Sequence, residues 1–377
     1  MSQVIALLDH RADPSTAEEW DHVGLVTGDP AAPVTSVRFA VDPLPPVIDA
    51  AVSAGVDLLV THHPMLLRGV HSVAESTRKG RSLAQLIRSG CALFTMHTNA
   101  DQATNGVNDA LADVVGLTSR RPIRPLAPAV PDRLVVYTPH DHADRLIDAL
   151  AQAGAGRMGD YDSCAYQVSG TGQFRPLSGA EPHIGTTGQI EHVDEARIEM
   201  VVAESARADV IAALRQVHPY EEPAFSLVAS RAIPGQTGIG RWGQVEPTTV
   251  AQVAARLAAA LPAGAAPVRY SGSPDRPVAS AALCGGAGDS LLGDVTRLGV
   301  DVYITGDLRH HPATDFLADT TTALIDIPHA SGESLWLAGW AQQLQTDAAA
   351  AGWTLTATAD AAPTDPWTGY IPAGGTA

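Results

Sequence analysis

The segment Gly55-Val56-Asp57-Leu58-Leu59-Val60-Thr61-His62-His63-Pro64 joins an apolar run to a polar end. A run of aliphatic residues without alternation is typical of a strand that is covered on both faces, as in a parallel sheet. The same pattern returns in Gly299-Val300-Asp301-Val302-Tyr303-Ile304-Thr305, with His310-His311-Pro312 after a short loop. We therefore interpret the two segments as equivalent strands of a duplicated unit.

The flanking sequence repeats in the same order around both strands. The pattern predicts strands at 37–41 and 278–284, helices at 44–54 and 290–298, and later strands at 91–96 and 322–327. Each later strand ends at a histidine with a carboxylate four residues on, His97 with Asp101 and His329 with Glu333. Strands that alternate with helices predict the α/β class, here a duplicated three-layer α/β unit that forms one core.

Two stretches rich in proline and glycine, 121–131 and 233–243, are predicted to be linkers. The strands and helices expected between them are typical of a small α+β, ferredoxin-like domain. Such a module can be inserted where the chain ends of the host lie close together at the surface. The predicted organisation is the first half of the α/β core at 1–130, an inserted domain at 131–232 and the second half of the core at 233–377.

Composition and charge exclude several classes of protein. The chain has 45% hydrophobic and 17% charged residues, typical of a globular protein, and lacks the apolar stretch of about 20 residues that crosses a bilayer. A net charge of −17 and only 5% aromatic residues disfavour binding to nucleic acid. Three scattered cysteines and an N-terminus without a signal-peptide pattern predict a cytoplasmic protein with free thiols.

Histidines and carboxylates gather at the expected carboxyl ends of the strands, where open α/β sheets bind ligands. His62 and His63 follow the first strand in a loop where both rings can converge, and Asp101 has two oxygens with which to bridge two cations. His329 and Glu333, four residues apart, are expected on one face of a helix. A lone histidine or acid is more often a capping or core residue. The repeat nevertheless favours a shared metal site made of these five residues.

Three imidazoles and two carboxylates are too rich in nitrogen for calcium or magnesium, and they lack the thiolates of a structural zinc site. We therefore predict two divalent metal ions per chain, either zinc, manganese or iron(II), about 3.5–4 Å apart. Because such a pair can activate water near neutral pH, the site predicts hydrolytic chemistry.

Other polar groups at the same strand ends are candidates for catalysis or for orienting the ligands, and the sequence does not rank them. They are Thr305, His310 and, as candidate catalytic residues, His97, His311 and Asp307. Three further segments each carry two interpretations. Residues 285–290 suit a phosphate-binding loop or a tight turn, 20–25 suit a rim of the site or an edge segment, and 218–223 suit a lid over the metals or a helix-to-strand turn.

Taken in order, these motifs resemble those of the NIF-three-like dinuclear-metal-centre family, also named GTP cyclohydrolase 1 type 2 homologues. The matching segments are 19–25, 61–64, 97–101, 106–109, 238–241, 285–288, 305–307 and the pair His329 and Glu333. The resemblance places the family's two-metal ligands on His62, His63, Asp101, His329 and Glu333. The inserted segment, ending in His-Pro-Tyr-Glu-Glu-Pro at 218–223, resembles the PII/CutA-like module of longer members.

The chain departs from the family pattern at three positions without losing a ligand. His22, Ala100 and Asn105 stand where the family usually has Asn, Leu and Gly. These departures put the shape of the pocket near Asp21 and Asp101 in question, whereas the predicted metal site is unaffected.

The resemblance implies a homo-oligomer, a hexameric ring, and a small-molecule substrate that is a nucleotide. In the implied reaction, metal-activated water opens the imidazole ring of GTP and formate is released. Since the chain is acidic, basic residues would have to help attract the phosphates, and the candidates are Arg68, Arg241 and Arg309. Two alternatives stay open: a metal-binding regulatory or interaction protein without turnover, and a nucleotide phosphoesterase.

Overall fold

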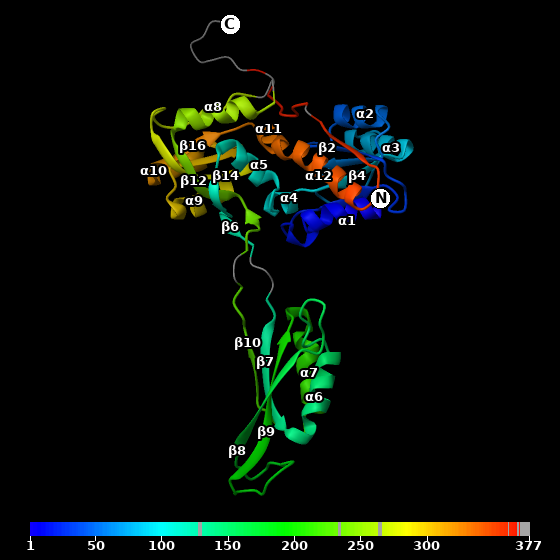
Figure 1. Ribbon diagram of the computed structural model, residues 1–377, viewed down its shortest axis with the longest axis vertical. Helices are drawn as coiled ribbons and strands as arrows, with labels where there is room; N and C mark the ends of the chain where they lie inside the picture. Colours follow the sequence, from blue (N-terminus) through cyan, green and yellow to red (C-terminus); the bar gives the residue numbers. More distant parts are fainter. Residues whose placement is uncertain (127–129, 233–234, 263–265, 361, 368, 370–377) are drawn as a thin grey trace. The chain divides into compact units, whose positions relative to one another are not determined.

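The computed structural model describes residues 1–126, 130–232, 235–262, 266–360, 362–367 and 369. The chain divides into two compact units, which Figure 1 labels by element. The large unit comprises Met1–Leu126 and Gly235–Ala377, and the small unit comprises Ala127–Pro234. Parts of both predicted linkers, at 127–129 and 233–234, lie outside the described residues.

A five-stranded sheet forms the centre of the first half of the large unit. Its order is β1 (Gly24–Thr27), β4 (Ala92–Thr95), β3 (Leu58–Thr61), β2 (Ser36–Ala40) and β17 (Thr356–Ala359). One face packs on α2 (Pro45–Ser53) and α3 (Arg78–Ser89), and the other on α1 (Ser2–Arg11) and α12 (Leu337–Ala350). Because successive side chains of a strand point to opposite faces, Leu59 packs toward α2 while Leu58 and Val60 pack toward α12.

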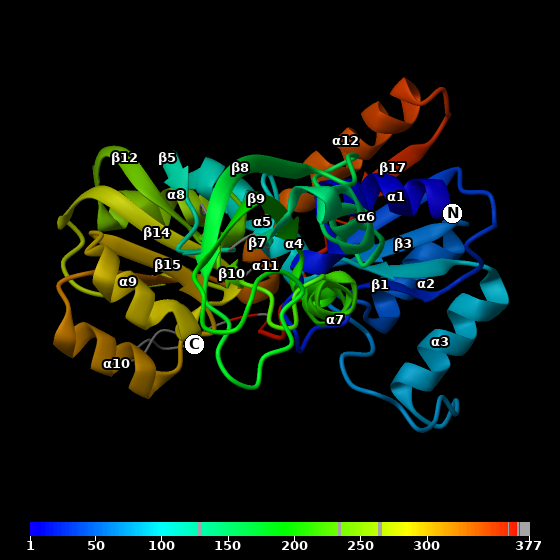
Figure 2. The ribbon, with the colours of Figure 1, turned by 90° about the horizontal axis from the view of Figure 1, so that it is seen from below.

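A six-stranded sheet forms the centre of the second half. Its order is β13 (Arg269–Tyr270), β16 (Ala323–Asp326), β15 (Val302–Gly306), β14 (Pro277–Ala287), β12 (Arg241–Thr249) and β5 (Thr118–Arg121). Helices α5 (Val107–Val115) and α8 (Val250–Ala260) cover one face, and α9 (Leu292–Leu298) and α10 (His310–Asp319) cover the other, as Figure 2 shows. A separate two-stranded sheet is formed by β6 (Arg124–Pro125) and β11 (Gly238–Ile239).

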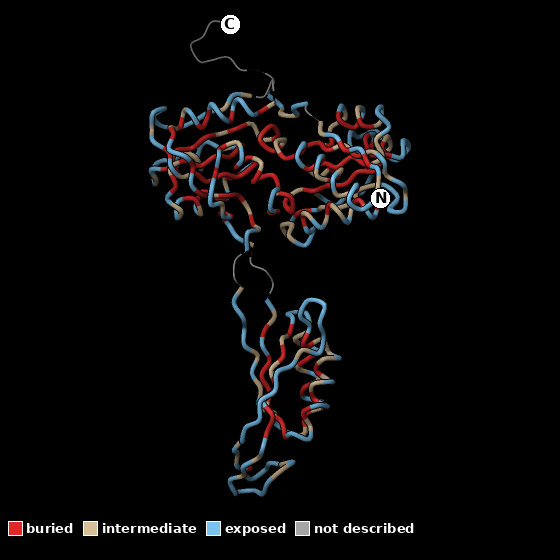
Figure 3. The backbone as a smooth tube through the Cα atoms, viewed as in Figure 1, coloured by how far each residue is buried: buried red, intermediate tan, exposed pale blue. Residues whose placement is uncertain are grey.

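The two halves share one plan, three parallel strands between helical layers. β3 pairs in parallel with β2 and β4, and β15 pairs in parallel with β14 and β16. Buried residues concentrate in these strands, as the red segments of Figure 3 show. The predicted α/β class is therefore confirmed, and each half has three layers.

The halves differ after their central strands. His62 and His63 follow β3 directly, whereas Asp307, Leu308 and Arg309 separate β15 from the second histidine pair. His310 and His311 consequently form the first turn of α10 and are exposed. The three additional residues thus place the second histidine pair in a helix, whereas the first pair lies in a loop.

The small unit is an α+β structure with an antiparallel sheet. The strand order is β10 (Phe225–Val228), β7 (Asp132–Pro139), β9 (Glu191–Val202) and β8 (Ala165–Phe174). Helices α6 (Ala143–Gln152) and α7 (Arg207–Val217) cover one face, where Leu146, Leu150 and Leu214 pack against β7 and β9. The resemblance of this unit to a PII/CutA-like module stays a prediction.

In each half, one aspartate just before the central strand forms hydrogen bonds to the backbone of the neighbouring strand. Asp57 Oδ2 accepts hydrogen bonds from the backbone N–H groups of Thr35 at 2.8 Å and Ser36 at 3.0 Å. In the other half, Asp301 Oδ2 accepts the N–H groups of Ala279 and Ser280, both at 2.9 Å. Partial burial would raise the pKa of each carboxyl, but these hydrogen bonds outweigh burial and lower the pKa. The repeated Gly-Val-Asp sequence therefore has a structural role.

We expect Asp57→Asn to lower the free energy of unfolding by about 1–2 kcal/mol at pH 7, because charge-assisted hydrogen bonds become neutral ones. Since the folded-state pKa of Asp57 is below the unfolded value, this stabilisation is present above pH about 4 and is lost as the pH falls through the folded pKa. Urea unfolding at pH 7 and in acid measures both effects. The exposed Asp315→Asn is the control, and equal midpoints for both variants would contradict the assignment.

Candidate metal centre

The five predicted ligands come together in the large unit, although they belong to different elements. His62 and His63 follow β3, and Asp101 lies on α4 (Thr98–Gln102), which begins just after β4. His329 and Glu333 are the first and last residues of α11 (His329–Glu333), which follows β16. Parallel strands end at the same edge of a sheet, so the strand ends of both halves supply the cluster.

The Glu333 carboxylate lies among the three imidazoles. Its Oε2 is 3.0 Å from His63 Nε2, while its Oε1 is 3.2 Å from His329 Nε2 and 3.4 Å from His62 Nε2. Asp101 Oδ1 is 3.7 Å from His62 Nε2. The Nε2 atoms of His63 and His329 approach to 3.3 Å. The donor atoms of all five side chains therefore converge.

Each imidazole of the cluster is held through its other ring nitrogen. The Nδ1 atom of His62 lies 2.9 Å from the carbonyl oxygen of Met96, which can only accept a hydrogen bond. The Nδ1 atoms of His63 and His329 lie 2.8 Å from Asp42 and Asp307. Donation from Nδ1 leaves a lone pair on Nε2 and fixes the orientation of the ring, which is how proteins prepare histidines to bind metals.

Three buried donor atoms in the cluster have no hydrogen-bond partner in the described part of the chain: His62 Nε2, Asp101 Oδ1 and Glu333 Oε2. Buried polar atoms are normally paired, so an unpaired set aimed at one place fits a bound cation. Two groups have donor atoms mutually within 4.8 Å, His62 with His63 and His97, and His63 with His329 and Glu333. This mixed nitrogen and oxygen set suits a transition metal better than calcium or magnesium.

The electrostatics of the cluster follow from burial and close contacts. Burial would raise the pKa of Glu333, but attraction to His63 and His62 holds it well below its usual value. Burial would lower the pKa of His329, but its hydrogen bond and attraction to Glu333 raise it to about 9. For Asp101 burial is the larger influence and raises the pKa. The cluster thus combines two carboxylates with histidines that can lose a proton. A divalent cation would balance the negative charge of these carboxylates.

His97, a candidate catalytic residue, lies beside the cluster. Its ring centroid is 5.2 Å from that of His62 and 5.6 Å from that of His63. Its Nδ1 atom is 2.8 Å from Asp21, which also accepts the backbone N–H of Thr98 at 3.0 Å. Burial would raise the pKa of Asp21, but the hydrogen bonds from His97 and Thr98 lower it strongly. Segment 20–25 therefore contributes Asp21 to the rim of the cluster.

The other two candidate catalytic residues differ in position. Asp307 contacts the cluster through His329 and has a left-handed φ of 55°. His311 lies on α10 with its ring 5.1 Å from that of His310, and no hydrogen bond or ion pair joins it to the cluster among the described residues. Asp307 is therefore placed to orient a ligand, and His311 is not brought to the cluster.

None of the three arginines considered for anion binding is among the described residues that line the pocket next to the cluster. Arg241 is buried and paired with Asp109, and Arg309 is paired with Asp289. Arg68 is exposed. A different residue, Arg269, lines the pocket next to the cluster, where it pairs with Asp326.

The glycine-rich loop at 285–288 makes room for the cluster. A side chain at Gly286 would put its Cβ 2.3 Å from Glu333 Oε1, and its φ of 66° lies in the left-handed region that favours glycine. The N–H of Gly285 donates to Asn108 Oδ1 at 2.9 Å, and Asn108 Nδ2 donates to the carbonyl of Asp101 at 2.8 Å. These contacts favour the tight-turn interpretation of the loop over a phosphate-binding one.

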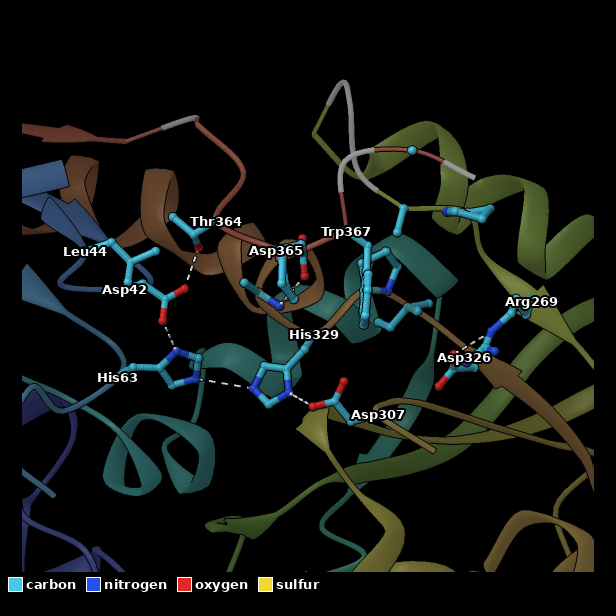
Figure 4. Close-up of a pocket in the computed structure, with 17 residues that line it drawn as sticks. Asp42, Leu44, His63, Arg269, Asp307, Asp326, His329, Thr364, Asp365 and Trp367 are labelled. Atoms are coloured by element: carbon cyan, nitrogen blue, oxygen red, sulfur yellow. Dashed lines mark hydrogen bonds and ion pairs between the residues drawn. The ribbon is translucent and has the colours of Figure 1, made fainter. Parts of the chain in front are cut away.

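A pocket of about 820 Å³ opens next to the cluster, as Figure 4 shows. His63 and His329 lie on its wall, together with Asp307. Arg269 and Trp367 lie on other parts of the wall. The candidate metal centre is thus accessible to a small molecule.

Two residues of the C-terminal segment contact residues that hold the cluster in place, and neither was predicted from the sequence. Thr364 donates its hydroxyl hydrogen bond to Asp42, which holds His63. Asp365 accepts the backbone N–H groups of Ala330 and Ser331, both at 3.0 Å, and so fixes the first turn of α11. Asp42 was detectable because it comes just after a predicted strand, whereas no local pattern marks Asp365.

We expect Asp365→Ala to weaken metal binding about tenfold, because α11 carries both His329 and Glu333 and loses the side chain that orients its first turn. Competition with a chromophoric chelator measures this affinity. The exposed Asp315→Ala serves as the matched control. Unchanged affinity in Asp365→Ala would show that the segment does not position these residues.

The sequence matches the family described as Duf34/NIF3 (NGG1p interacting factor 3) over residues 1–366. It is 46% identical over 369 residues to the GTP cyclohydrolase 1 type 2 homolog of Mycobacterium tuberculosis, covering 97% of this chain and 96% of that protein. The Bacillus subtilis protein of the same name is 35% identical over 314 residues, covering 83% of this chain and 84% of that protein.

Solved structures of related proteins resemble the chain over nearly its whole length. A Bacillus cereus protein related to NIF3 has 31% sequence identity and a TM-score of 0.66, with 97% of each chain covered. A Staphylococcus aureus protein has 29% identity and a TM-score of 0.77, with 98% of each chain covered. The motifs quoted from the sequence and these independent comparisons agree on one family.

Proposed function

Because the chain belongs to the Duf34/NIF3 family, we propose that it is a dinuclear metal-dependent hydrolase of the GTP cyclohydrolase type. The observation that carries the proposal is the convergence of three imidazole Nε2 atoms on Glu333, with each Nδ1 held by an oxygen. Two divalent ions, zinc, manganese or iron(II), would supply Lewis acidity and lower the pKa of water.

Each of the three proposed histidine ligands has a support that fixes the orientation of its ring. His62, His63 and His329 would bind through Nε2, and Glu333 and Asp101 through their carboxylates. Asp101 would hold metal through its carboxylate, whose Oδ1 is buried and has no hydrogen-bond partner among the described residues. Asp42 and Asp307 are positioning residues, because they act through His63 and His329.

His97 is the candidate for moving a proton in this reaction. Asp21 holds its Nδ1 atom, so Nε2 is the nitrogen left to accept or donate a proton near the cluster. The proposed substrate is a purine nucleotide whose imidazole ring is opened by water with release of formate. Arg269, on the wall of the adjacent pocket, is the proposed contact for a negatively charged group.

The test is formate release from GTP by protein reconstituted with zinc, manganese or iron(II). We expect turnover by the wild type and background rates for His63→Ala, which loses an imidazole 3.0 Å from Glu333. Elemental analysis of protein purified without added metal should give a ratio near two ions per chain. Equal background rates for both proteins with all three metals would refute the cyclohydrolase activity.

The two other functions give different results in the same assays. A metal-binding regulatory protein would retain the metals but show no turnover on a panel of nucleotides, and the pocket of the small unit described below favours it as the second candidate. A phosphoesterase would release phosphate rather than formate.

The assembly and the cellular compartment are proposed from the family resemblance. We propose a homo-oligomer in the form of a hexameric ring, acting in the cytoplasm, and light scattering of the purified protein tests the ring. Among the described residues, no helix is both long and apolar enough to cross a membrane.

A further inference from the structure

The small unit has a pocket of its own, with a volume of about 460 Å³. Its wall includes the end of β8, the middle of β9 and the turn after α7, and much of it is aromatic. The aromatic side chains are Tyr137, Phe174, His183 and Tyr220. The proposed hydrolase function does not involve these residues.

Tyr220 is the centre of this aromatic wall. Its ring centroid lies 5.8 Å from that of Phe174, 6.4 Å from that of His183 and 5.2 Å from that of His218. His218 Nδ1 accepts the backbone N–H of Tyr220 at 3.0 Å, so its Nε2 donates to the carbonyl of Tyr137 at 2.8 Å. Both ring nitrogens of His218 are therefore used within the small unit, and they fix the turn that presents Tyr220.

Glu195 places a buried carboxylate in the same pocket. The residue is 8% exposed, and its Oε1 accepts the hydroxyl hydrogen bond of Tyr220 at 2.8 Å. Among the described residues, Oε2 has no hydrogen-bond partner and no lysine or arginine lies within 4.0 Å of the carboxylate. Gly172 makes this arrangement possible, because a Cβ there would come within 2.1 Å of Oε2.

The rest of the pocket is also negative. Glu221 and Glu222 line it, and the described lining residues include no lysine or arginine. The nearby Arg197 pairs with Glu199 at 2.8 Å, and its guanidinium carbon lies 5.9 Å from the centre of the Tyr137 ring. A mostly buried carboxylate without a cationic partner attracts a cation, and so do aromatic faces.

We propose that this pocket binds a small organic cation, an amine with a flat apolar body. The ammonium group would lie at Glu195, and the body would lie against Phe174 and Tyr220. A metal ion is a poorer fit, because His218 has no free nitrogen and no group of three metal-binding side chains occurs here among the described residues. The pocket thereby gives the small unit a ligand-binding role separate from the metal centre.

The proposal is tested on the full-length protein by titration calorimetry with three probes of one shape, benzylamine, benzyl alcohol and benzoate. We expect benzylamine to bind at least about tenfold more tightly than the neutral alcohol, and benzoate not to bind, because only the ammonium complements Glu195. This comparison needs no variant. Equal binding of all three probes, or no binding of benzylamine at millimolar concentration, would overturn the proposal.

Variants then locate the site. Glu195→Gln should weaken benzylamine at least about tenfold while leaving the weak binding of benzyl alcohol unchanged. Glu246→Gln, exposed on β12 in the large unit, should change neither. Thermal unfolding checks that Glu195→Gln is folded. Full affinity for benzylamine in folded Glu195→Gln would place the binding elsewhere and refute the assignment.

Discussion

Replacing Glu333 by Gln is expected to weaken the binding of divalent metal by at least about 100-fold and to abolish formate release. Mutating a residue that hydrogen-bonds to a metal ligand typically lowers metal affinity 10- to about 100-fold. Removing the charge of a ligand itself should lower the affinity by more. Glu333 lies within 3.0–3.4 Å of all three imidazole Nε2 atoms, which makes it the shared member of the cluster. Glutamine keeps the size of the side chain but loses its charge.

The measurement is the metal content after dialysis against a chelator of known affinity, together with a binding titration. Glu246→Gln is the matched control, because it makes the same chemical change at an exposed position in the same unit. If Glu333→Gln retained two ions per chain with unchanged affinity, the ligand assignment would be wrong. Loss of formate release with normal metal content would instead place Glu333 in the reaction.

Arg241→Ala is expected to lower the free energy of unfolding by about 3–5 kcal/mol, because the change removes five buried hydrogen bonds and leaves the Asp109 carboxylate with only the more distant Arg120, at 3.7 Å. The Arg241 side chain is buried, and its Nε and Nη2 atoms each donate to Asp109 at 3.0 Å. It also donates to the carbonyls of Gly238 at 2.7 Å, Gly240 at 2.8 Å and Ala103 at 2.7 Å. One side chain thereby joins β12 to α5 and to the residue that follows α4.

Urea unfolding of the large unit, followed by tryptophan fluorescence, measures this loss. Arg68→Ala is the control, since Arg68 is exposed. Arg241→Lys should fall between the two, because lysine keeps the charge but cannot form the two-pronged contact with Asp109. A loss below about 1 kcal/mol for Arg241→Ala would contradict the structural role.

The fold was predictable where local pattern and burial agree. Both central strands are buried on both faces, and their sequences are therefore mostly apolar. This pattern predicted parallel strands at Leu58–Thr61 and Val302–Gly306. The sequence did not predict that the two histidine pairs have different secondary structure, the first after a strand and the second at the start of a helix. The three residues 307–309 decide whether the pair ends a strand or begins a helix, and that depends on how the chain packs after β15.

The candidate site was predictable to the extent that it obeys the strand-end rule. His62, His63 and His329 lie near strand ends, and the same rule covers Asp42, which was missed. The contribution of Asp365 follows no such rule, because its partners Ala330 and Ser331 are brought near by tertiary packing. Arg241 is one of three candidates for anion binding in the sequence, because its burial cannot be deduced from sequence alone.

The cluster draws His62, His63 and Asp101 from one copy of the repeat and His329 and Glu333 from the other. A polypeptide with a single copy could assemble such a set only by pairing with a second polypeptide. Joining two copies in one gene product removes that dependence and lets each copy lose what the other supplies. The second His-His-Pro motif shows this freedom, because it forms the exposed start of α10 instead of a pair at the end of a strand.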